Sequence, residues 1–600
     1  MLNSSVRRPD LTRALLIVLL LDLLLQGFGL WRSIDQHPAV LHPRGDALEY
    51  WEWAGRISEG EFVGETPFLS APLYPYFVGL VRAMGGGMVS VYVLQLLMRT
   101  LTAWLLARSA KHLFGHLGYG LATAVLFLWL QEPAYYAVRL LNSSLQLLVL
   151  AALLHGCIAW REDLTRKRQL GLGALLGLSV LSNPAMLITL PFFAWWLGVR
   201  PPALRTSATV LGTALLTILP ATLHNLAATS GSPGGTEFIL LSAQSGVTYS
   251  HGNAEGALGT YKPLEGVSLD RQRQNADAYR IAAEATGKEG WKNTSDYFLQ
   301  KGVDWQLANP GQAIALAFTK LRWFFAGRNY GDLYNINLEN RDPDWPRQVP
   351  LPGGLLELGW LFPAAFYGLF LLIRRDRRHA IPIATLLLAV LFVVVVFWYS
   401  PRYRLPAAPV AALLTPFGIF ALARYFQRLP QVAALAVATL LPALALEGWT
   451  LASGFDPRDD VRGQYEAKVG AFFIEVEQFD KAQARLESAL TFGHENAEIH
   501  HGIAECQVKS GATADRAGDR TTADALYREA IGHYRRAVEI NPKRLDTRFS
   551  LGSVLAYVGQ IEAARNVLQE SAGVADELGE MEMAARMRQK LASLPPSPPK

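Results

Sequence analysis

Two carboxylates and a tryptophan follow the first apolar stretch of the chain at helical spacing. Asp46, Glu49 and Trp53 share one face if this stretch is a helix. A carboxylate at that place could act as a general base, because a hydroxyl or amine must lose a proton as it attacks a reacting carbon. An ordinary solvated acidic helix explains the same spacing, and composition alone favours that plainer interpretation.

A second cluster, Arg402-Tyr403-Arg404, lies two residues before Pro406, at the beginning of a late apolar segment. Arginine is permanently charged and offers bidentate hydrogen bonds to a phosphate. The cluster could therefore bind a phosphate at the membrane surface and stabilise its charge as it leaves. Arginines that only extend their charged ends toward water are the alternative. Two arginines around a tyrosine, just before a proline-bounded span, favour the phosphate site.

Four further polar residues are weaker candidates for a site: Asp35, Arg139, His251 and Lys262. Asp35 comes directly after the first apolar stretch but lacks the pattern that follows Asp46. For Arg139, His251 and Lys262 a plain surface role is the simpler expectation.

The sequence predicts no cofactor and no metal site. No group of histidines and carboxylates has metal-ligand spacing, and Cys157 and Cys506 are too few for a thiolate zinc cluster or a disulfide scaffold. Gly85-Gly86-Gly87 joins two apolar segments and is expected to form a turn rather than a phosphate-binding loop. The lack of such a loop argues against a nucleotide-sugar substrate on the cytoplasmic side.

An unusually apolar chain must position these residues. Of its 600 residues 51% are hydrophobic and only 18% are charged, which excludes a mostly disordered protein and argues against an ordinary soluble enzyme. A membrane helix needs about 20 apolar residues, so we expect a polytopic helix bundle of about eleven spans that begins with an uncleaved anchor. The expected spans are 11–30, 72–107, 117–131, 133–160, 169–182, 184–199, 206–227, 353–374, 380–398, 404–425 and 431–451.

Basic clusters alternate with these spans and predict their orientation. If all the clusters are cytoplasmic, the spans between them pair, and one odd span leads out at the end. The N-terminus is then inside, while the loops 31–71 and 228–352 and everything after 452 are outside. Lys and Arg that only cap helices are the alternative, which the agreement of six clusters disfavours. The clusters lie near 7–13, 108–111, 161–168, 200–205, 374–378 and 424–428.

The polar rear of the chain has the pattern of an α-solenoid of tetratricopeptide type. Residues 456–600 carry 19 Lys and Arg against 23 Asp and Glu, so their net charge is −4 and the preceding part carries +9. Small residues recur with a 34-residue step from Ala537 to Ser571, whereas Ala489 to Ala537 is 48 residues, which predicts a loop-like insertion near 510–522.

The whole chain is thus expected to be all-α, with two parts of different character. The solenoid would offer a concave surface to a peptide or protein partner, or else cap the membrane part or join two copies. The expected organisation is a membrane domain at 1–452, a linker at 453–462, three repeat units and a capping helix of about 574–592 within 463–594, and a disordered tail at 595–600.

The membrane part resembles a known enzyme superfamily in the order and spacing of several short motifs. It is similar to GT-C glycosyltransferases, and more closely to the bacterial relatives of protein O-mannosyltransferases and of lipid A aminoarabinose transferases. The motifs that carry the resemblance are Asp46 with Tyr50, Ala54 and Gly60, Pro67-Phe68, Pro72-Leu73-Tyr74-Pro75, His224-Asn225, Ser245-Gly246-Val247 with His251-Gly252-Asn253 and Gly259-Thr260-Tyr261, Tyr297-Phe298 with Asn309-Pro310 and Lys320, and Arg402-Tyr403-Arg404-Leu405-Pro406.

The resemblance implies a glycosyltransferase of class EC 2.4 that takes its sugar from a polyprenyl phosphate. Transfer would occur on the non-cytoplasmic face by direct displacement with inversion. Asp46 would be the catalytic aspartate, Glu49 a supporting acid, and the arginine cluster the binding site of the donor phosphate. Many relatives also have an acidic residue after the second outer turn. Here that region runs from Arg139 to Ser144 without one, and Glu132 lies earlier, before Pro133, so a second acidic role is in doubt.

Partners and two rival functions follow from this interpretation. The acceptor would be a protein or an envelope glycolipid, with membrane lipid around the spans, a protein partner on the repeats and no nucleic acid. The expected location is the bacterial inner (plasma) membrane. A membrane-anchored repeat scaffold for envelope assembly is one alternative, and a transporter of lipid-linked glycans is another. Few charged residues within the spans and a large outer loop favour the enzyme.

Overall fold

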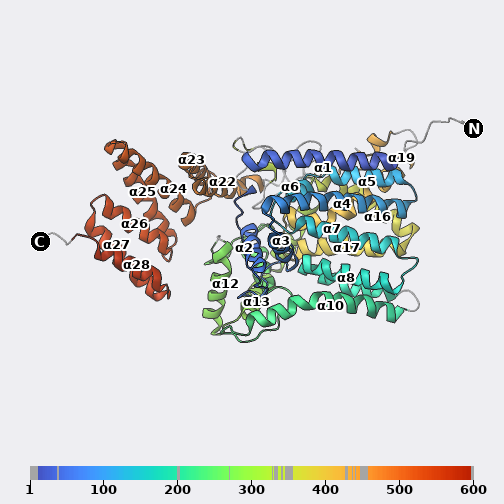
Figure 1. Cartoon of the computed structure of the whole chain (residues 1–600), viewed down its shortest axis with the longest axis horizontal. Coiled ribbons are helices and arrows are strands. Elements are labelled where there is room, and N and C mark those ends of the chain that lie inside the picture. The colour runs from blue at the N-terminus through green and yellow to red at the C-terminus, as the bar shows by residue number, and fades with distance from the viewer. Residues whose placement is uncertain are drawn as a thin grey trace, which may run out of the picture. The chain divides into compact units, whose positions relative to one another are not determined.

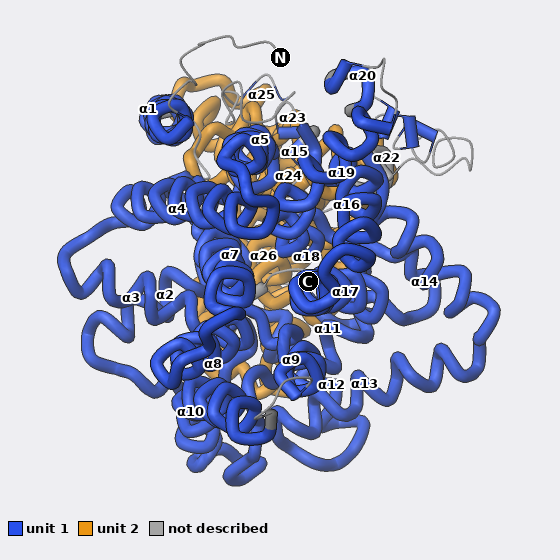
Figure 2. The backbone as a smooth tube through the Cα atoms, turned by 90° about the vertical axis from the view of Figure 1, so that its right-hand side faces the viewer, with its two compact units in different colours: residues 1–455 blue, residues 456–600 orange. Residues whose placement is uncertain are grey.

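The chain divides into two compact units, residues 1–455 and 456–600, in the computed structural model (Figure 2). Within the described residues regular structure is helical, with one isolated bridge between Leu130 and Leu356. The expected all-α class is therefore confirmed. The structure describes residues 11–36, 40–198, 203–268, 271–327, 356–425 and 457–595, and parts of 329–344 and 430–445.

Long apolar helices run side by side through the first unit (Figure 1). Among the described residues, six segments are long and apolar enough to cross a membrane: Leu11–Ile34, Met88–Phe114, Leu204–Thr229, Leu358–Arg375, Arg377–Val396 and Pro401–Tyr425. Three shorter apolar helical segments accompany them, at Leu117–Trp129, Ser143–Ala159 and Pro184–Gly198. The protein is therefore an integral multi-pass membrane protein.

Apart from the polar layer described below, the helices of the first unit come in two groups along the chain. The first group is α1 (Leu11–Gln36), α2 (Asp46–Ser58), α3 (Leu73–Ala83), α4 (Met88–Phe114), α5 (Leu117–Trp129), α6 (Gln131–Ala137), α7 (Ser143–Ala159), α8 (Arg166–Ser182), η2 (Pro184–Ile188), α9 (Thr189–Gly198) and α10 (Ala203–Thr229). The second group is η3 (Leu358–Leu361), α16 (Phe362–Arg375), α17 (Arg377–Val396), α18 (Pro401–Arg404), η4 (Leu405–Ala407), α19 (Ala408–Tyr425) and α20 (Gln431–Leu435).

Two of the expected spans are interrupted. The segment 72–107 breaks between α3 and α4 at Gly85, whose φ of 84° is a conformation that glycine adopts without strain. With 11 residues, α3 is too short to cross a membrane. The segment 133–160 divides into α6 and α7. Of the expected span 431–451 only parts are described, so most of it lies outside the described residues.

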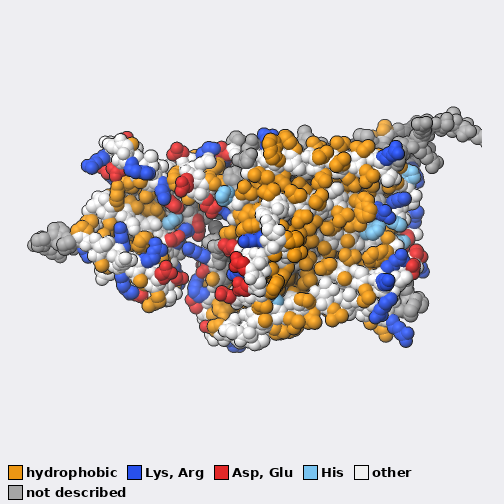
Figure 3. Space-filling view, in the orientation of Figure 1, with side chains coloured by type: hydrophobic (Ala, Val, Ile, Leu, Met, Phe, Trp, Pro, Cys, Tyr) orange, Lys and Arg blue, Asp and Glu red, His pale blue; other side chains and the backbone are white. Residues whose placement is uncertain are grey.

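Between the two groups a set of polar helices forms a layer at one end of the bundle. In Figure 1 its helices α12 and α13 lie beside α2, at the end where α1 finishes. Lys and Arg gather at the opposite end of the apolar surface (Figure 3), which agrees with the predicted alternation of basic clusters. The helices of this layer are α11 (Ser245–Gly252), α12 (Arg271–Thr286), α13 (Trp291–Ala308), α14 (Pro310–Phe325) and α15 (Ile336–Glu339).

Glycines allow the membrane helices to approach closely. A Cβ atom at Gly418 of α19 would lie 2.1 Å from the carbonyl oxygen of Ala364 in α16. A Cβ atom at Gly368 of α16 would lie 2.5 Å from the carbonyl oxygen of Leu414. Small residues at such crossings are typical of membrane helices, which associate through packing rather than through the hydrophobic effect.

One buried ion pair fixes the first helix to the bundle. Arg99 of α4 pairs with Asp22 of α1, and the two side chains are 1% and 5% exposed. Arg99 also donates to the carbonyl of Leu128, 2.7 Å away, near the end of α5. A charge within the membrane is costly unless it is paired, so the pair joins three helices and gives Asp22 a structural role.

The second unit is a stack of antiparallel helix pairs, as the repeat pattern predicts. Small residues are needed where paired helices touch, and Ala482, Ala489, Ala530, Ala537 and Ala564 are fully buried. The tetratricopeptide-type solenoid is thus confirmed as an arrangement of helices. Its members are α22 (Pro457–Glu475), α23 (Phe479–Thr491), α24 (Ala497–Arg516), α25 (Arg520–Ile540), α26 (Leu545–Tyr557), α27 (Ile561–Glu577) and α28 (Met581–Ala592).

Three boundaries in this unit differ from expectation. The insertion at 510–522 is mostly helical: residues 510–516 belong to α24 and residues 520–522 to α25. A short turn at 517–519 separates the two helices, and Asp519 caps α25 by accepting from the Thr522 amide at 3.1 Å. Helix α22 begins at Pro457, within the expected linker. The capping helix α28 begins at Met581 rather than near 574, after a turn at Gly579 with a φ of 74°. Residues 596–600 of the expected tail lie outside the described residues.

Replacing Gly418 with valine is expected to destabilise the membrane unit, because the new side chain would collide with the backbone of α16. Overpacking of this kind costs about 1–3 kcal/mol. The measurement is the midpoint of thermal unfolding in detergent. Gly212→Ala is the matched control, since no atom lies within 4 Å of a Cβ atom there. A midpoint unchanged by Gly418→Val would contradict the close crossing of α16 and α19.

Candidate functional site

An ion pair between Asp46 and Arg402 forms the centre of the candidate site. Arg402 Nη1 donates to Asp46 Oδ2 at 2.6 Å, although the two residues are 356 positions apart. Their side chains are 25% and 17% exposed, respectively, so the pair is accessible to a ligand. The structure thus brings together the two residues that the sequence nominates independently, one as a base and the other as a phosphate ligand.

Helix α2 positions the carboxylates. Asp46 is its first residue, where a negative charge is favoured by the helix dipole. Glu49, one turn later, accepts a hydrogen bond of 3.3 Å from the Ser70 hydroxyl. Tyr50 is buried beside them, and burial, followed by the charges of Asp46 and Glu49, raises the pKa of its phenol. Tyr50 therefore stays protonated and can act as a hydrogen-bond donor.

Trp53 does not share an open face with the carboxylates. It is 4% exposed and stacks on Phe68 with ring centroids 4.9 Å apart. Phe68 stacks in turn on His224 at 4.0 Å, and the Asn225 side chain accepts from the Phe68 amide at 2.8 Å. The His224-Asn225 motif therefore anchors the loop after α2, and through it the helix that carries Asp46.

Helix α18 positions Arg402. Ser400 caps this short helix by accepting from the Arg402 amide at 3.1 Å, and Pro401 occupies its first turn. The guanidinium carbon of Arg402 lies 5.7 Å from the ring centroid of Tyr403. Tyr403 in turn packs on Trp398 at 4.6 Å. The guanidinium thus has a carboxylate partner and an aromatic neighbour.

Arg404, expected as a second phosphate ligand, lies instead in the interior. Its side chain has no exposed surface and pairs with Glu132 at 3.3 Å. It also donates to the Ala326 carbonyl at 2.9 Å and to the Asn329 side chain at 2.7 Å. A guanidinium with these partners has no access to a donor phosphate. Arg404 therefore positions α18 rather than binding phosphate. Glu132 is its counterion and also accepts from the Leu358 amide at 2.9 Å.

Three of the four weaker candidates, Arg139, His251 and Lys262, have partners of their own in the structure. Arg139 is buried rather than on the surface and pairs with Glu339 at 2.5 Å, where Glu339 also accepts from the Tyr135 hydroxyl at 2.8 Å. The buried His251 contacts the Lys262 carbonyl through Nδ1 at 2.7 Å, and the Lys262 amine donates to the Glu255 carbonyl. The side chain of Asp35 lies outside the described residues.

The end of α17 is held by side chains from the outer layer. The Lys320 amine donates to the carbonyls of Val395 and Phe397 at 3.3 and 2.7 Å, and the Asn253 side chain donates to the Val396 carbonyl at 2.8 Å. The last carbonyls of a helix have no partner within it, so these contacts satisfy them. Burial lowers the pKa of Lys320 to about 7.

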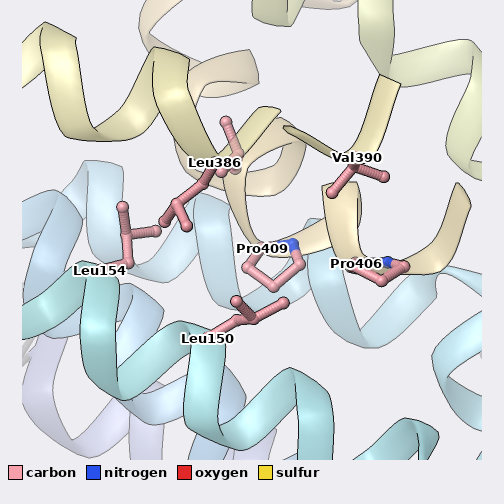
Figure 4. A pocket seen from close by; sticks show the side chains of 7 residues that line it. Leu150, Leu154, Leu386, Val390, Pro406 and Pro409 are labelled. Atoms are coloured by element: carbon pink, nitrogen blue, oxygen red, sulfur yellow. The ribbon is translucent and has the colours of Figure 1, made fainter. Parts of the chain in front are cut away.

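An apolar crevice lies between α7, α17 and the residues that follow α18 (Figure 4). It is too narrow for a water molecule, and its lining side chains pack against one another. Its lining residues are Leu150, Leu154, Leu386, Val390, Pro406, Pro409 and Val410.

The part of the chain that the structure describes contains no candidate metal site. No group of three or more His, Cys, Asp or Glu side chains there could hold a metal ion. The residues that sequence reasoning missed are Tyr50, Ser70 and Trp398. Tyr50 and Trp398 lie within the quoted motifs or beside them, but nothing in their spacing indicated their partners.

No family model and no curated protein matches the chain. Several solved structures resemble it in part. One is an Archaeoglobus fulgidus oligosaccharyltransferase in complex with Zn and sulfate, with 14% identity and a TM-score of 0.40, covering 72% of this chain and 51% of that one. Another is the oligosaccharyltransferase AglB of the same organism, in complex with an inhibitory peptide and a dolichol-phosphate, with 16% identity, a TM-score of 0.37, and coverages of 72% and 54%.

Yeast Tom70 also resembles the chain, with 12% identity and a TM-score of 0.20, covering 74% of this chain and 92% of Tom70. The chain spans about half the length of the oligosaccharyltransferases that it matches. The fold and the site described above rest on the chain's own helices and contacts.

Arg404→Met is expected to destabilise the protein far more than Arg402→Met. Removing Arg404 leaves the Glu132 carboxylate buried without its counterion, which typically costs about 3–5 kcal/mol. Arg402 is partly exposed, so its loss costs much less. Thermal unfolding in detergent measures both. Adding Glu132→Gln to Arg404→Met should recover part of the loss, and equal losses for the two single variants would refute the assignment.

Lys320 makes stability depend on pH in a defined direction. Its folded pKa of about 7 lies below the ordinary value of 10.5. Below pH 7 the folded state bears the full cost of the buried charge. Above pH 7 the folded state loses the proton while the unfolded state keeps it, so that cost declines up to about pH 10. The stability of the wild type relative to Lys320→Met should therefore rise between pH 7 and 9. A constant difference would show that Lys320 does not titrate there.

Proposed function

We propose that the protein is a membrane glycosyltransferase that moves a sugar from a polyprenyl phosphate to an acceptor outside the cytoplasm. The observation that carries the proposal is the accessible 2.6 Å ion pair of Asp46 and Arg402. A carboxylate and a guanidinium held close together can take the proton of an acceptor and bind the phosphate that leaves. The matching order of motifs along the membrane part supports the same chemistry.

The reaction begins with the acceptor, a hydroxyl or amine, beside Asp46. As its oxygen or nitrogen attacks the anomeric carbon of the sugar, Asp46 takes the proton. The bond from that carbon to the phosphate oxygen breaks, and the electron pair leaves with the phosphate. Attack opposite to the leaving group inverts the anomeric centre. Glu49, one turn further along α2, would serve as a supporting acid.

Arg402 serves the donor in this scheme. A phosphate that approaches the pair competes with Asp46 for the guanidinium, which can bind two anions through separate N–H groups. Its charge then favours the leaving phosphate more than the bound ester, because negative charge grows there in the transition state. The polyprenyl chain would lie along the apolar surface of α7, α17 and α19.

The topology we propose has the N-terminus in the cytoplasm and α2, α18 and the polar helical layer outside. The basic end of the bundle supports this, since cytoplasmic loops are enriched in Lys and Arg. The repeat unit would then be outside, where a protein acceptor or an envelope partner could bind it. The proposed location is the bacterial inner membrane.

Asp46→Asn is expected to reduce sugar transfer about 100-fold or more, because the amide cannot take the acceptor proton. The assay measures transfer from a radiolabelled polyprenyl-phosphate sugar to envelope acceptors in membranes. Arg402→Ala should raise the apparent KM for the donor.

The matched control is Glu52→Gln, which removes an exposed carboxylate from the same helix. It should leave transfer unchanged. Undiminished transfer by Asp46→Asn would remove the base from the mechanism. Failure of the wild type to transfer any sugar from a panel of such donors would overturn the proposed function.

A further inference from the structure

Three aromatic side chains line up beside Arg402. The ring of Tyr261 lies 5.5 Å from that of Trp398, and Trp398 lies 4.6 Å from Tyr403. Tyr403 is the aromatic neighbour of Arg402, which itself holds Asp46. Tyr261 and Tyr403 are partly exposed, whereas Trp398 is 6% exposed. We name these three residues the aromatic wall.

The indole N–H of Trp398 stands out among the polar groups of the wall. It is buried and has no hydrogen-bond partner among the residues that the structure describes. Indole N–H groups that are buried almost always have a partner, and an unsatisfied donor is costly. Such a group beside a reaction centre is best explained by a ligand acceptor.

The wall is built from two distant segments that the backbone holds together. The Tyr399 amide donates to the Gly259 carbonyl at 2.8 Å. The Tyr261 hydroxyl accepts from Gln274 at 2.6 Å, and its ring packs on His251 at 4.6 Å. A Cβ atom at Gly252 would lie 1.9 Å from the Phe397 carbonyl oxygen, so the approach of the two segments leaves no room for a side chain. The wall is therefore preorganised.

We infer that the aromatic wall binds the sugar of the donor, with the Trp398 indole N–H donating to one of its hydroxyl oxygens. This inference rests on the proposed function and deepens it by assigning the sugar subsite. A sugar ring has an apolar face of C–H groups and a rim of hydroxyls. Aromatic rings pack against the apolar face, and a fixed N–H donor distinguishes sugars by the positions of their hydroxyls.

The placement suits transfer. The phosphate of the donor lies at Arg402, and the sugar is directly attached to that phosphate. A sugar ring held by Tyr403 and Trp398 is therefore bonded directly to the phosphate at Arg402 and lies close to Asp46. Binding that orients the anomeric carbon toward Asp46 contributes to rate as well as to affinity. Trp398 is a positioning residue in this scheme, because it acts on the sugar rather than on the reacting bond.

The test compares two kinds of probe on the full-length protein in detergent. One is farnesyl phosphate, and the other is a panel of its hexosyl and pentosyl derivatives. The wild type should bind at least one glycosylated probe more tightly than farnesyl phosphate. Trp398→Phe keeps a ring but removes the N–H. It should lower the affinity for that probe about tenfold and leave the affinity for farnesyl phosphate unchanged.

Controls separate this inference from the proposed function. Trp195→Phe, at an exposed position of α9, should leave both affinities unchanged. If Trp398→Phe lowers the thermal midpoint, Tyr261→Leu provides a second variant that should weaken only the glycosylated probe. If the wild type binds all probes equally, or if neither variant changes any affinity, the aromatic wall does not bind the sugar, while the proposed function stands. A wild type that binds neither kind of probe would overturn both.

Discussion

The break between α17 and α18 is the constraint on which the rest of the membrane unit depends. A helix that ends here leaves the carbonyls of Val395, Val396 and Phe397 without partners in their own helix. Lys320 and Asn253, from the outer layer, supply those partners. Because unsatisfied carbonyls near hydrocarbon are costly, the outer layer cannot detach without exposing them. The helix end thereby fixes the layer, and the layer fixes the approach to Asp46.

The same short segment distributes two arginines to opposite environments. Arg402 reaches an accessible carboxylate, whereas Arg404, two residues later, is sealed among carbonyls and Glu132. A partly exposed guanidinium can exchange its partner at little cost, while a buried one cannot. One arginine is thus available for ligand exchange because the other holds the helix in place. Because only Tyr403 separates them, the anchoring of α18 by Arg404 also fixes the backbone position of Arg402.

The extent to which the sequence predicted this arrangement differs between features. Hydrophobic length and the 34-residue step were sufficient for the membrane bundle and the solenoid. Motif order identified Asp46 and Arg402, yet nothing in the sequence predicted that they touch. Arg404 looked equivalent to Arg402 because exposure is a property of packing, not of residue type. Residues 510–522 look loop-like because they are small and polar, but the alanines among them favour helix, and the neighbouring helices extend into the segment from both sides up to the turn at 517–519.

The distance along the chain between the paired charges has a consequence for biosynthesis. Asp46 leaves the ribosome 356 residues before Arg402. The nascent chain therefore inserts most of its membrane unit before Arg402 is made, and the ion pair of Asp46 and Arg402 can form only after α18 is translated. The helical repeats follow α18 in the sequence. Each of them is therefore synthesised after both members of the Asp46–Arg402 ion pair are present in the chain.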